Sequence, residues 1–295
     1  MLDRPEPVEG FDEDRYLMLN PDVREAVQNG QFDSGWHHYV RHGFAEGRPG
    51  VTPEVYSEAL DLLAGPLDHP VPPPHLRHRV NGSEDLLAFL HIGQTIASEL
   101  HAAITYRIAL DPSHQVLDFG CGCGRVLRHI QPHVNRAALH GSDVDAEAIS
   151  WCQENLSDIG QFGMNEPSPP LDYPDASFDV VYSVSVFTHL AEDAQFLWLD
   201  ELARITRPGG ILLLSTHGPH LSDHDDPNAR KNLQNHGFHC TELPRPDGPP
   251  ECNDTNSFHT HAYILHNWVR YFEIETILTN GVARLQDLVI CRQRE

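Results

Sequence analysis

The feature that most restricts the fold is a short apolar run that leads directly into three closely spaced glycines. Residues 116–119 are apolar apart from Asp118, and the segment GCGCGR follows at residues 120–125. Glycine has no Cβ, so a loop of this kind lets the backbone approach a bound molecule closely. The pattern predicts a buried strand, a ligand-binding loop and the start of a helix.

Apolar runs and helical patterns alternate beyond this loop. The predicted strands are residues 138–143, 178–183 and 211–215, and the predicted helices between them are residues 146–156 and about 193–205. This alternation predicts βαβ units, and therefore a parallel sheet covered on both faces. The apolar runs 271–278 and 283–291 flank Thr279-Asn280-Gly281-Val282. Because Asn-Gly is the strongest short hairpin signal, the sheet is expected to end in an antiparallel pair with its turn here.

The first 64 residues are predicted to form a small helical hairpin appendage. Asn20-Pro21 is typical of a helix start, and Gly30 would end that helix. Ser34 would begin a second helix that Gly43 ends. The segment GPLDHPVPPP, residues 65–74, predicts a stiff linker, which leaves residues 75–295 as the main domain.

Composition excludes several classes of function. The 295 residues carry a formal net charge of −23, and Lys231 is the only lysine. Nucleic-acid binding relies on basic contacts to phosphate, so no nucleic-acid partner is expected. A Walker A loop needs a lysine after its glycines, and none stands there. No apolar run approaches the roughly 18 residues of a membrane span, and the six cysteines show no C-x-x-C pattern. We therefore expect a reduced cytoplasmic protein.

The spacing of the glycine loop indicates the ligand. A dinucleotide fingerprint reads G-x-G-x-x-G, whereas this loop reads G-x-G-x-G and has Arg125 at the place of the third glycine. Asp118 stands two residues before the first glycine, where its carboxylate would repel a pyrophosphate. A ligand with a cationic centre would be attracted instead. These differences favour S-adenosyl-L-methionine, which carries an ammonium and a sulfonium, over a nicotinamide dinucleotide.

The D-x-G-x-G-x-G loop resembles motif I of the class I S-adenosylmethionine-dependent methyltransferases. The resemblance continues through PDASFDVV at residues 174–181 and LARITRPGGILLL at residues 202–214, and it spans roughly residues 116–291. It implies a Rossmann-like seven-stranded α/β sheet, mostly parallel with a C-terminal antiparallel hairpin. It also implies S-adenosyl-L-methionine as the cofactor and methyl transfer as the reaction.

The same resemblance assigns cofactor-binding residues. The family's ribose-binding acidic residue falls on Asp143, with Asp145 as the alternative, although Asp145 is more typical of a helix cap. The segment 162–165 would form a loop against the adenine, with Asn165 able to bind its amine. The predicted cofactor-binding residues are Asp118, Gly120, Cys121, Gly122, Gly124, Arg125, Asp143, Val144, Asn165 and Ser183.

Histidines are the candidates for the catalytic base. The chain has 21 of them, many in its last third. His189 follows the fourth strand of the family pattern and His217 follows the fifth, while His259 and His261 could reach the same pocket. Because its ordinary pKa lies near 6.5, a histidine could accept the proton of a hydroxyl acceptor, and His217 is favoured. Zinc binding by the late histidines is the alternative, but no known ligand spacing is complete, so no metal is predicted.

The acceptor is inferred from two further resemblances. The stretches LDFGCGCGRVLRH, SVFTHL and QDL resemble bacterial methyltransferases often associated with surface-glycan assembly. The N-terminal stretch from YLMLNPDV to HGFAEGRPG resembles a segment of bacterial glycosyltransferases and surface-polysaccharide proteins. They imply a sugar hydroxyl as acceptor, with glycan-assembly enzymes as partners of the hairpin. A small-molecule natural product is the alternative acceptor. A nucleotide-dependent oxidoreductase and a catalytically silent cofactor-binding scaffold are the alternative classes.

Overall fold

A computed structural model gives the architecture of the chain. It describes residues 11–43, 48, 69–134, 137–222, 226–242 and 255–295. The chain divides into two compact units, Met1–Gly93 and Gln94–Glu295. The first four residues of the predicted linker 65–74 lie outside the described residues. The predicted division into a hairpin, a linker and a main domain therefore stays a prediction.

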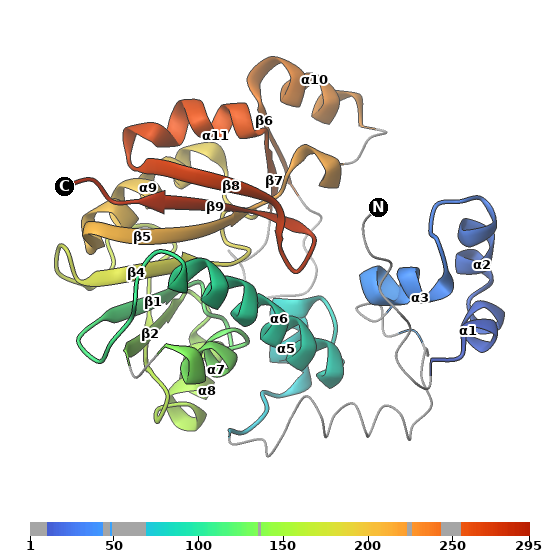
Figure 1. Cartoon of the computed structure of the whole chain (residues 1–295), viewed down its shortest axis with the longest axis horizontal. Coiled ribbons are helices and arrows are strands. Elements are labelled where there is room, and N and C mark those ends of the chain that lie inside the picture. The colour runs from blue at the N-terminus through green and yellow to red at the C-terminus, as the bar shows by residue number, and fades with distance from the viewer. Residues whose placement is uncertain (1–10, 44–47, 49–68, 135–136, 223–225, 243–254) are drawn as a thin grey trace. The chain divides into compact units, whose positions relative to one another are not determined.

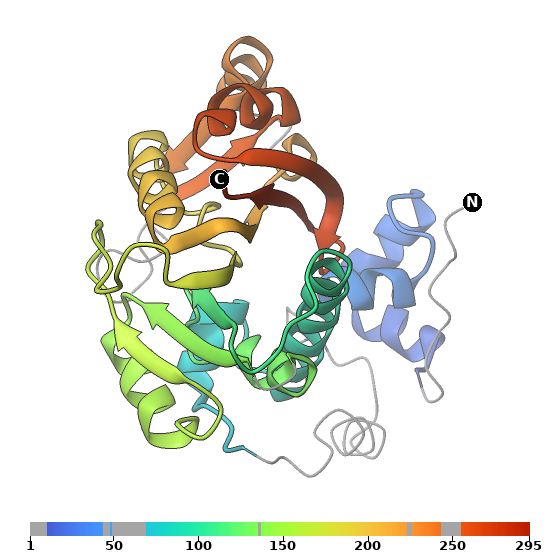
Figure 2. The same cartoon turned by 60° about the vertical axis from the view of Figure 1, so that its left-hand side comes forward.

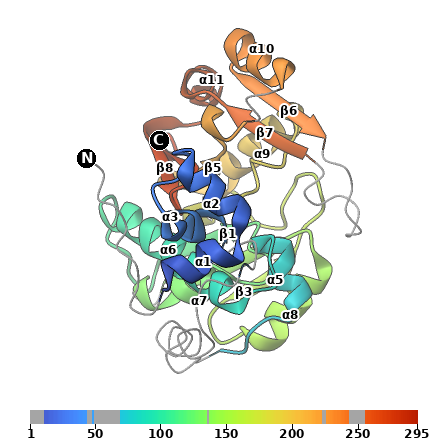
Figure 3. The same cartoon turned by 90° about the vertical axis from the view of Figure 1, so that its right-hand side faces the viewer.

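The first unit contains short helices with a small aromatic core. Its elements are α1 (Glu13–Leu19), α2 (Pro21–Gln28), α3 (Gly35–His38), the π-helix η1 (Tyr39–Gly43) and α5 (Pro74–Asn81). The three blue helices α1, α2 and α3 are seen together in Figure 3. Tyr16, Val23, Trp36 and Tyr39 form the buried cluster. The predicted starts are confirmed, because Pro21 opens α2 and the Ser34 side chain accepts a hydrogen bond at the start of α3.

The second unit is built on a seven-stranded sheet. Its strands are β1 (Gln115–Phe119), β2 (Ala138–Asp143), β3 (Gln161–Met164), β4 (Phe178–Ser183), β5 (Thr206–Thr216), β8 (Glu273–Val282) and β9 (Gln286–Arg292). Their order is β3-β2-β1-β4-β5-β9-β8, and Figure 1 shows this succession from β8 down to β2. The first five strands are parallel, and β9 is antiparallel to both β5 and β8. The predicted mixed sheet is confirmed.

Helices and a second, two-stranded sheet complete this unit. The helical elements are α6 (Leu86–Thr105), which crosses the boundary between the units, α7 (Leu127–Ile130), η2 (Gln131–His133), α8 (Ala146–Asn155), α9 (Glu192–Ile205), η3 (Pro219–Leu221), α10 (Pro227–His236), α11 (His261–Asn267) and η4 (Trp268–Arg270). The sequence did not suggest the small sheet of β6 (Phe238–Glu242) and β7 (Thr255–His259). In Figures 1 and 3 this sheet lies with α10 and α11, away from α8.

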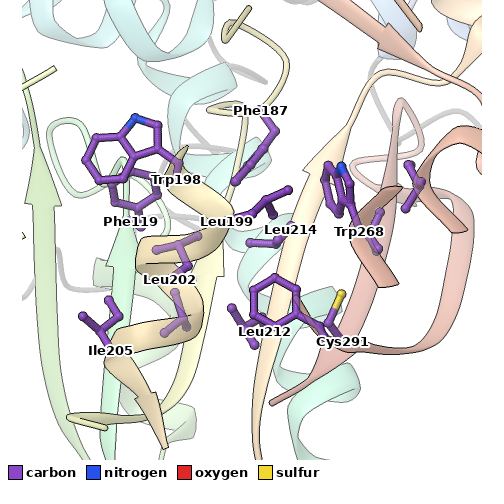
Figure 4. Close-up of a cluster of buried hydrophobic side chains, with 14 of the residues drawn as sticks. Phe119, Phe187, Trp198, Leu199, Leu202, Ile205, Leu212, Leu214, Trp268 and Cys291 are labelled. Atoms are coloured by element: carbon purple, nitrogen blue, oxygen red, sulfur yellow. The ribbon is translucent and has the colours of Figure 1, made fainter. Parts of the chain in front are cut away.

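The core fixes the central strands and the loops that follow them. Figure 4 shows the α9 side chains Leu199 and Leu202 facing Leu212 and Leu214 of β5, whereas Trp198 packs against Phe119. Phe119 at the end of β1 and Trp268 belong to the same cluster. Full burial of one such side chain stabilises the fold by about 1.5–3 kcal/mol. The carboxyl ends of β1, β4 and β5 are therefore held in place by packing.

The turn of the C-terminal hairpin does not lie where the sequence predicted it. β8 runs through Asn280-Gly281 to Val282, and the chain turns at residues 283–285. The strand register shifts between Leu278 and Val282, so Asn-Gly forms an irregularity within the strand. The predicted turn position is wrong because the Asp287 carboxylate accepts the Asn280 N–H at 2.9 Å and keeps this segment beside β9. Figure 2 shows the hairpin as a long curved ribbon.

Candidate active site

The predicted cofactor residues and His217 gather along one edge of the large sheet. β1, β2, β4 and β5 are parallel and end at Phe119, Asp143, Ser183 and Thr216. β9 runs the other way, so its first residues lie at the same edge, and Asp287 pairs with Thr216. In open α/β sheets, ligands bind outside these carboxyl ends.

The glycine loop requires glycine for two reasons. Gly120, Gly122 and Gly124 have φ angles of 82°, 51° and 74°, which other residues rarely adopt. The space around them is also filled, because a Cβ on Gly120 would overlap the Val186 side chain. A Cβ on Gly124 would lie 2.6 Å from Leu156 Cδ1. The glycine backbone after β1 therefore carries no side chains, and the Val186 and Leu156 side chains pack directly against it.

The loop cysteines are packing residues. Cys121, Cys123 and Cys152 are buried around the loop. Burial raises the pKa of Cys123 to about 12 and raises that of Cys121 well above its usual value. The Cys121 and Cys152 thiols both donate to the Gly122 carbonyl. Since a thiolate is the nucleophilic form, these thiols are inert at neutral pH.

Asp118 places a buried carboxyl group next to the glycine loop. The residue is only 3% exposed, and burial raises its pKa to about 8, against the lowering effects of the Tyr182 hydroxyl and the Arg125 guanidinium. A carboxylate in this position is stabilised by a cation and destabilised by another anion. The ammonium of S-adenosylmethionine would therefore stabilise the ionised carboxylate, whereas a pyrophosphate would disfavour it. Arg125 is half-buried and stands between the glycine loop and α7 in the sequence.

Asp143 ties the end of β2 to the loop. Its Oδ2 accepts the Gly122 N–H at 2.7 Å, and its Oδ1 accepts the Asp145 N–H at 2.9 Å. A carboxylate offers about four lone-pair sites, so both oxygens can still receive the two neighbouring hydroxyls of a ribose. Asp145 instead uses its carboxylate to cap α8 through the Glu147 and Ala148 N–H groups, which leaves Asp143 as the ribose candidate.

Asn165 directly follows β3, and Ser183 is the last residue of β4. The Asn165 N–H donates to the Asp143 carbonyl at 3.0 Å, and its Oδ1 accepts the Ser142 hydroxyl at 2.6 Å. The segment 162–165, predicted as a loop, is mostly the short strand β3, with Asn165 just beyond it. Val144 directly follows β2, half-buried next to Asp143. The Ser183 hydroxyl is fully buried at the end of β4.

His217 and His189 lie close together. Their ring centroids are 6.3 Å apart, and the His217 ring stacks on Phe258 at 5.4 Å. His189 Nδ1 is 2.7 Å from the Thr255 carbonyl, so it donates a hydrogen bond to the first residue of β7. Burial lowers the pKa of His217 to about 4, which keeps this imidazole neutral at physiological pH.

His259 and His261 have opposite surroundings. His259 is fully buried, its Nε2 lies 2.9 Å from Gln195 Oε1, and burial lowers its pKa to about 3. It is therefore a core residue without access to an acceptor. The His261 side chain is 39% exposed, and its Nε2 lies 2.8 Å from Asp287 Oδ2.

The structure adds three polar residues that had no predicted role. Ser185 has a φ of 62°, a strained backbone geometry often found at functional sites. Its N–H donates to Ser215 Oγ at 2.7 Å, and its hydroxyl accepts from Gln286 Nε2 at 2.8 Å. Gln286 Nε2 in turn lies 3.5 Å from His217 Nε2. Sequence position alone could not have revealed this series of hydrogen bonds, although Gln286 belongs to the QDL stretch noted in the sequence.

Several buried polar atoms at this edge have no hydrogen-bond partner among the described residues. They are Ser183 Oγ, Thr216 Oγ1, His217 Nδ1 and Gln286 Oε1. Buried polar groups in native proteins are normally paired, so such a group of atoms indicates where a polar ligand binds. In the described part of the chain, no three His, Cys, Asp or Glu side chains are arranged to hold a metal. No described helix is long and apolar enough to cross a bilayer.

Comparison with known proteins agrees with this geometry. Residues 116–210 match a family model described as a methyltransferase domain. The chain is 34% identical to 2-methyl-6-phytyl-1,4-hydroquinone methyltransferase of Synechocystis sp., over 36% of this chain and 33% of that protein. It is 30% identical to a fatty-acid O-methyltransferase of Mycolicibacterium smegmatis, over 36% of this chain and 38% of that protein. The chain thus spans only about a third of the length of these relatives.

A solved structure shows the same fold. The 1,6-didemethyltoxoflavin-N1-methyltransferase of Burkholderia thailandensis, with bound 1,6-didemethyltoxoflavin and S-adenosylhomocysteine, aligns with a TM-score of 0.51. The alignment covers 84% of this chain and 92% of that one at 16% identity, which is a likeness of fold alone. The strand order, the glycine loop with its two carboxylates and the family match lead to one conclusion: residues 116–210 belong to a class I methyltransferase domain whose methyl donor is S-adenosyl-L-methionine.

Proposed function

We propose that this protein methylates a hydroxyl oxygen on a polar, sugar-like acceptor. The observation that carries the proposal is the group of buried, unpartnered polar atoms at the ends of β5 and β9. Thr216 Oγ1, His217 Nδ1 and Gln286 Oε1 have no partner among the described residues. A hydroxyl both donates and accepts hydrogen bonds, so hydroxyls on a small acceptor would satisfy these atoms. A purely apolar acceptor would leave them unpaired at a cost of about 1–3 kcal/mol each.

Residues of this chain would hold the two substrates for direct transfer. Asp118 would face the ammonium of S-adenosylmethionine and Asp143 its ribose hydroxyls. When bound, S-adenosylmethionine supplies an electrophilic methyl group on its sulfonium. The protein's contribution is to align the acceptor oxygen with that methyl group and to accept the hydroxyl proton.

A sugar hydroxyl in a bacterial glycan is the first candidate acceptor. The likeness of the N-terminal stretch to a segment of glycosyltransferases and surface-polysaccharide proteins supports it, with glycan-assembly enzymes as partners. The relatives are named for a hydroquinone and a fatty acid, so the matches favour no single acceptor. A small-molecule natural product with a free hydroxyl is therefore the second candidate.

The test is an acceptor screen followed by one substitution. S-adenosylhomocysteine release would be measured with nucleotide sugars, oligosaccharides, hydroquinones and fatty acids, and mass spectrometry and NMR would locate the new methyl group. With the best acceptor, Thr216→Val removes a hydroxyl without changing side-chain shape. One hydrogen bond is worth about 0.5–1.5 kcal/mol, so the KM for the acceptor should rise about two- to tenfold.

The matched control is Thr279→Val, which removes an exposed hydroxyl from β8 and should leave the KM unchanged. Methyl transfer to oxygen together with a higher KM for Thr216→Val supports the proposal. Transfer only to nitrogen or carbon contradicts it, as does an acceptor without a polar group near the methylated atom.

A further inference from the structure

We propose that Asp287 is a positioning residue that orients His261 as the base for the acceptor hydroxyl. This inference rests on the proposed O-methylation and names the residues that remove the proton. Neither Asp287 nor its pairing with His261 could be read from the sequence pattern.

The Asp287 carboxylate is held from two sides. The residue is 1% exposed, its Oδ1 accepts the Asn280 N–H at 2.9 Å, and its Oδ2 lies 2.8 Å from His261 Nε2. A carboxylate in this contact accepts a hydrogen, so Nε2 of His261 carries the proton. In the neutral imidazole, the other nitrogen, Nδ1, then has the free lone pair. Asp287 thereby fixes both the ring orientation and the tautomer of His261.

The pair lies at the edge of the sheet that binds the ligands. Asp287 is the register partner of Thr216 at the carboxyl end of β5. A Cβ on Gly218 would come within 2.7 Å of both Asp287 Oδ2 and His220 Nδ1. Gly218 has an ordinary φ of −73°, so glycine is needed here for space, not for backbone conformation. The chain after β5 therefore passes directly over the Asp287 carboxylate.

The other three histidines are less suited to the role. His259 is fully buried and His189 donates its Nδ1 hydrogen to a backbone carbonyl. His217 has no carboxylate partner among the described residues and lies where it can bind the acceptor hydroxyl through Nδ1. The His261 ring is partly exposed, so it can pass its proton on to water. The titratable groups around the Asp287 carboxylate are His217, His220 and His261.

The step balances without a further reactant. The acceptor oxygen forms a bond to the methyl carbon as the carbon–sulfur bond breaks, and the electron pair of that bond stays on sulfur. The hydroxyl proton passes to His261 Nδ1 and then to solvent. The products are the methyl ether, S-adenosylhomocysteine and a proton.

The first test reads the tautomer without any substrate. The full chain, labelled with ¹⁵N at its histidines, would be studied by NMR, and His261→Gln would identify the His261 signals. We expect His261 to be the Nε2–H tautomer with a hydrogen-bonded proton. In Asp287→Asn the amide oxygen can still accept the Asn280 N–H, but His261 loses its carboxylate partner. The NMR signature of a hydrogen-bonded Nε2–H on His261 should therefore disappear. An Nδ1–H tautomer in the unsubstituted protein would overturn the proposal.

The second test uses the acceptor found by the screen. General-base catalysis contributes about 10²–10⁴-fold, so His261→Gln should lower kcat at least a hundredfold and remove the acidic limb of the pH–rate profile. Asp287→Asn should also lower kcat, while the acceptor KM and the affinity for S-adenosylhomocysteine stay within twofold. The control is His266→Gln, an exposed histidine on the same helix, α11, which should leave the rate unchanged.

The outcomes separate this inference from the proposed function. If His261→Gln methylates the same hydroxyl at the normal rate, the pairing is not the catalytic base, and O-methylation stands. If the unsubstituted protein methylates only nitrogen or carbon, both proposals fall.

Discussion

Substitution of Gly120 by alanine tests why the cofactor loop needs its glycines. Gly120 has a φ of 82°, and alanine in this left-handed region costs about 1–2 kcal/mol. The added Cβ would also overlap Val186 Cγ2, and overpacking of this kind costs a further ~1–3 kcal/mol. Gly120→Ala should therefore lower the free energy of unfolding by about 2–5 kcal/mol. Since Val186 must move away from the loop, affinity for S-adenosylhomocysteine should fall as well.

Gly209 provides the matched control. Its φ is 78°, and a Cβ there would meet no atom within 4 Å, so Gly209→Ala measures the backbone cost alone. Urea unfolding would give both stabilities, and calorimetry would give the affinities. The double variant Gly120→Ala/Val186→Ala should recover the steric part relative to Val186→Ala alone. If Gly120→Ala is destabilised no more than Gly209→Ala, the overlap with Val186 costs no free energy, which contradicts this prediction.

Three further predictions concern the cofactor, pH and the N-terminal residues. Asp143→Ala removes charge-assisted bonds worth about 1.5–3 kcal/mol each, so calorimetry should show a ten- to hundredfold loss of S-adenosylhomocysteine affinity; unchanged affinity would move the role elsewhere. The pKa of His259 is about 3 in the folded chain and near 6.5 when unfolded, so the unfolded chain binds more protons between these values. Stability should fall as pH drops from 6.5 towards 3, and His259→Gln should flatten that slope by up to about 1.4 kcal/mol per pH unit; an equal slope refutes this. A chain that starts at Pro72 should still bind S-adenosylhomocysteine; loss of folding would contradict the predicted domain division.

Strand positions were predictable because short, largely buried segments alternate with helical patterns along the chain. Residues 138–143 and 178–183 form β2 and β4 with the predicted ends. The glycine loop was readable for a related reason, since each of its glycines meets a backbone or steric requirement that no other residue meets. Asp145 also caps α8 as its position suggested.

Features that depend on distant contacts were not predictable. Asn280-Gly281 has the local signature of a turn, but Asp287 accepts the Asn280 N–H and keeps the segment in the strand. The small sheet of β6 and β7 has no clear alternation, and its strands are joined by residues outside the described chain. The sequence favoured His217 but could not rank His259 against His261, and only burial and partners separate His259 in the core from His261 beside a carboxylate.

The loop after β1 is suited to S-adenosylmethionine and not to a dinucleotide. The most direct measurement is calorimetric titration of the full chain with S-adenosylhomocysteine and, separately, with NAD. Because Asp118 is buried next to the glycine loop, we expect one-to-one binding of S-adenosylhomocysteine and no heat of binding with NAD. Tight binding of NAD with no response to S-adenosylhomocysteine would contradict it.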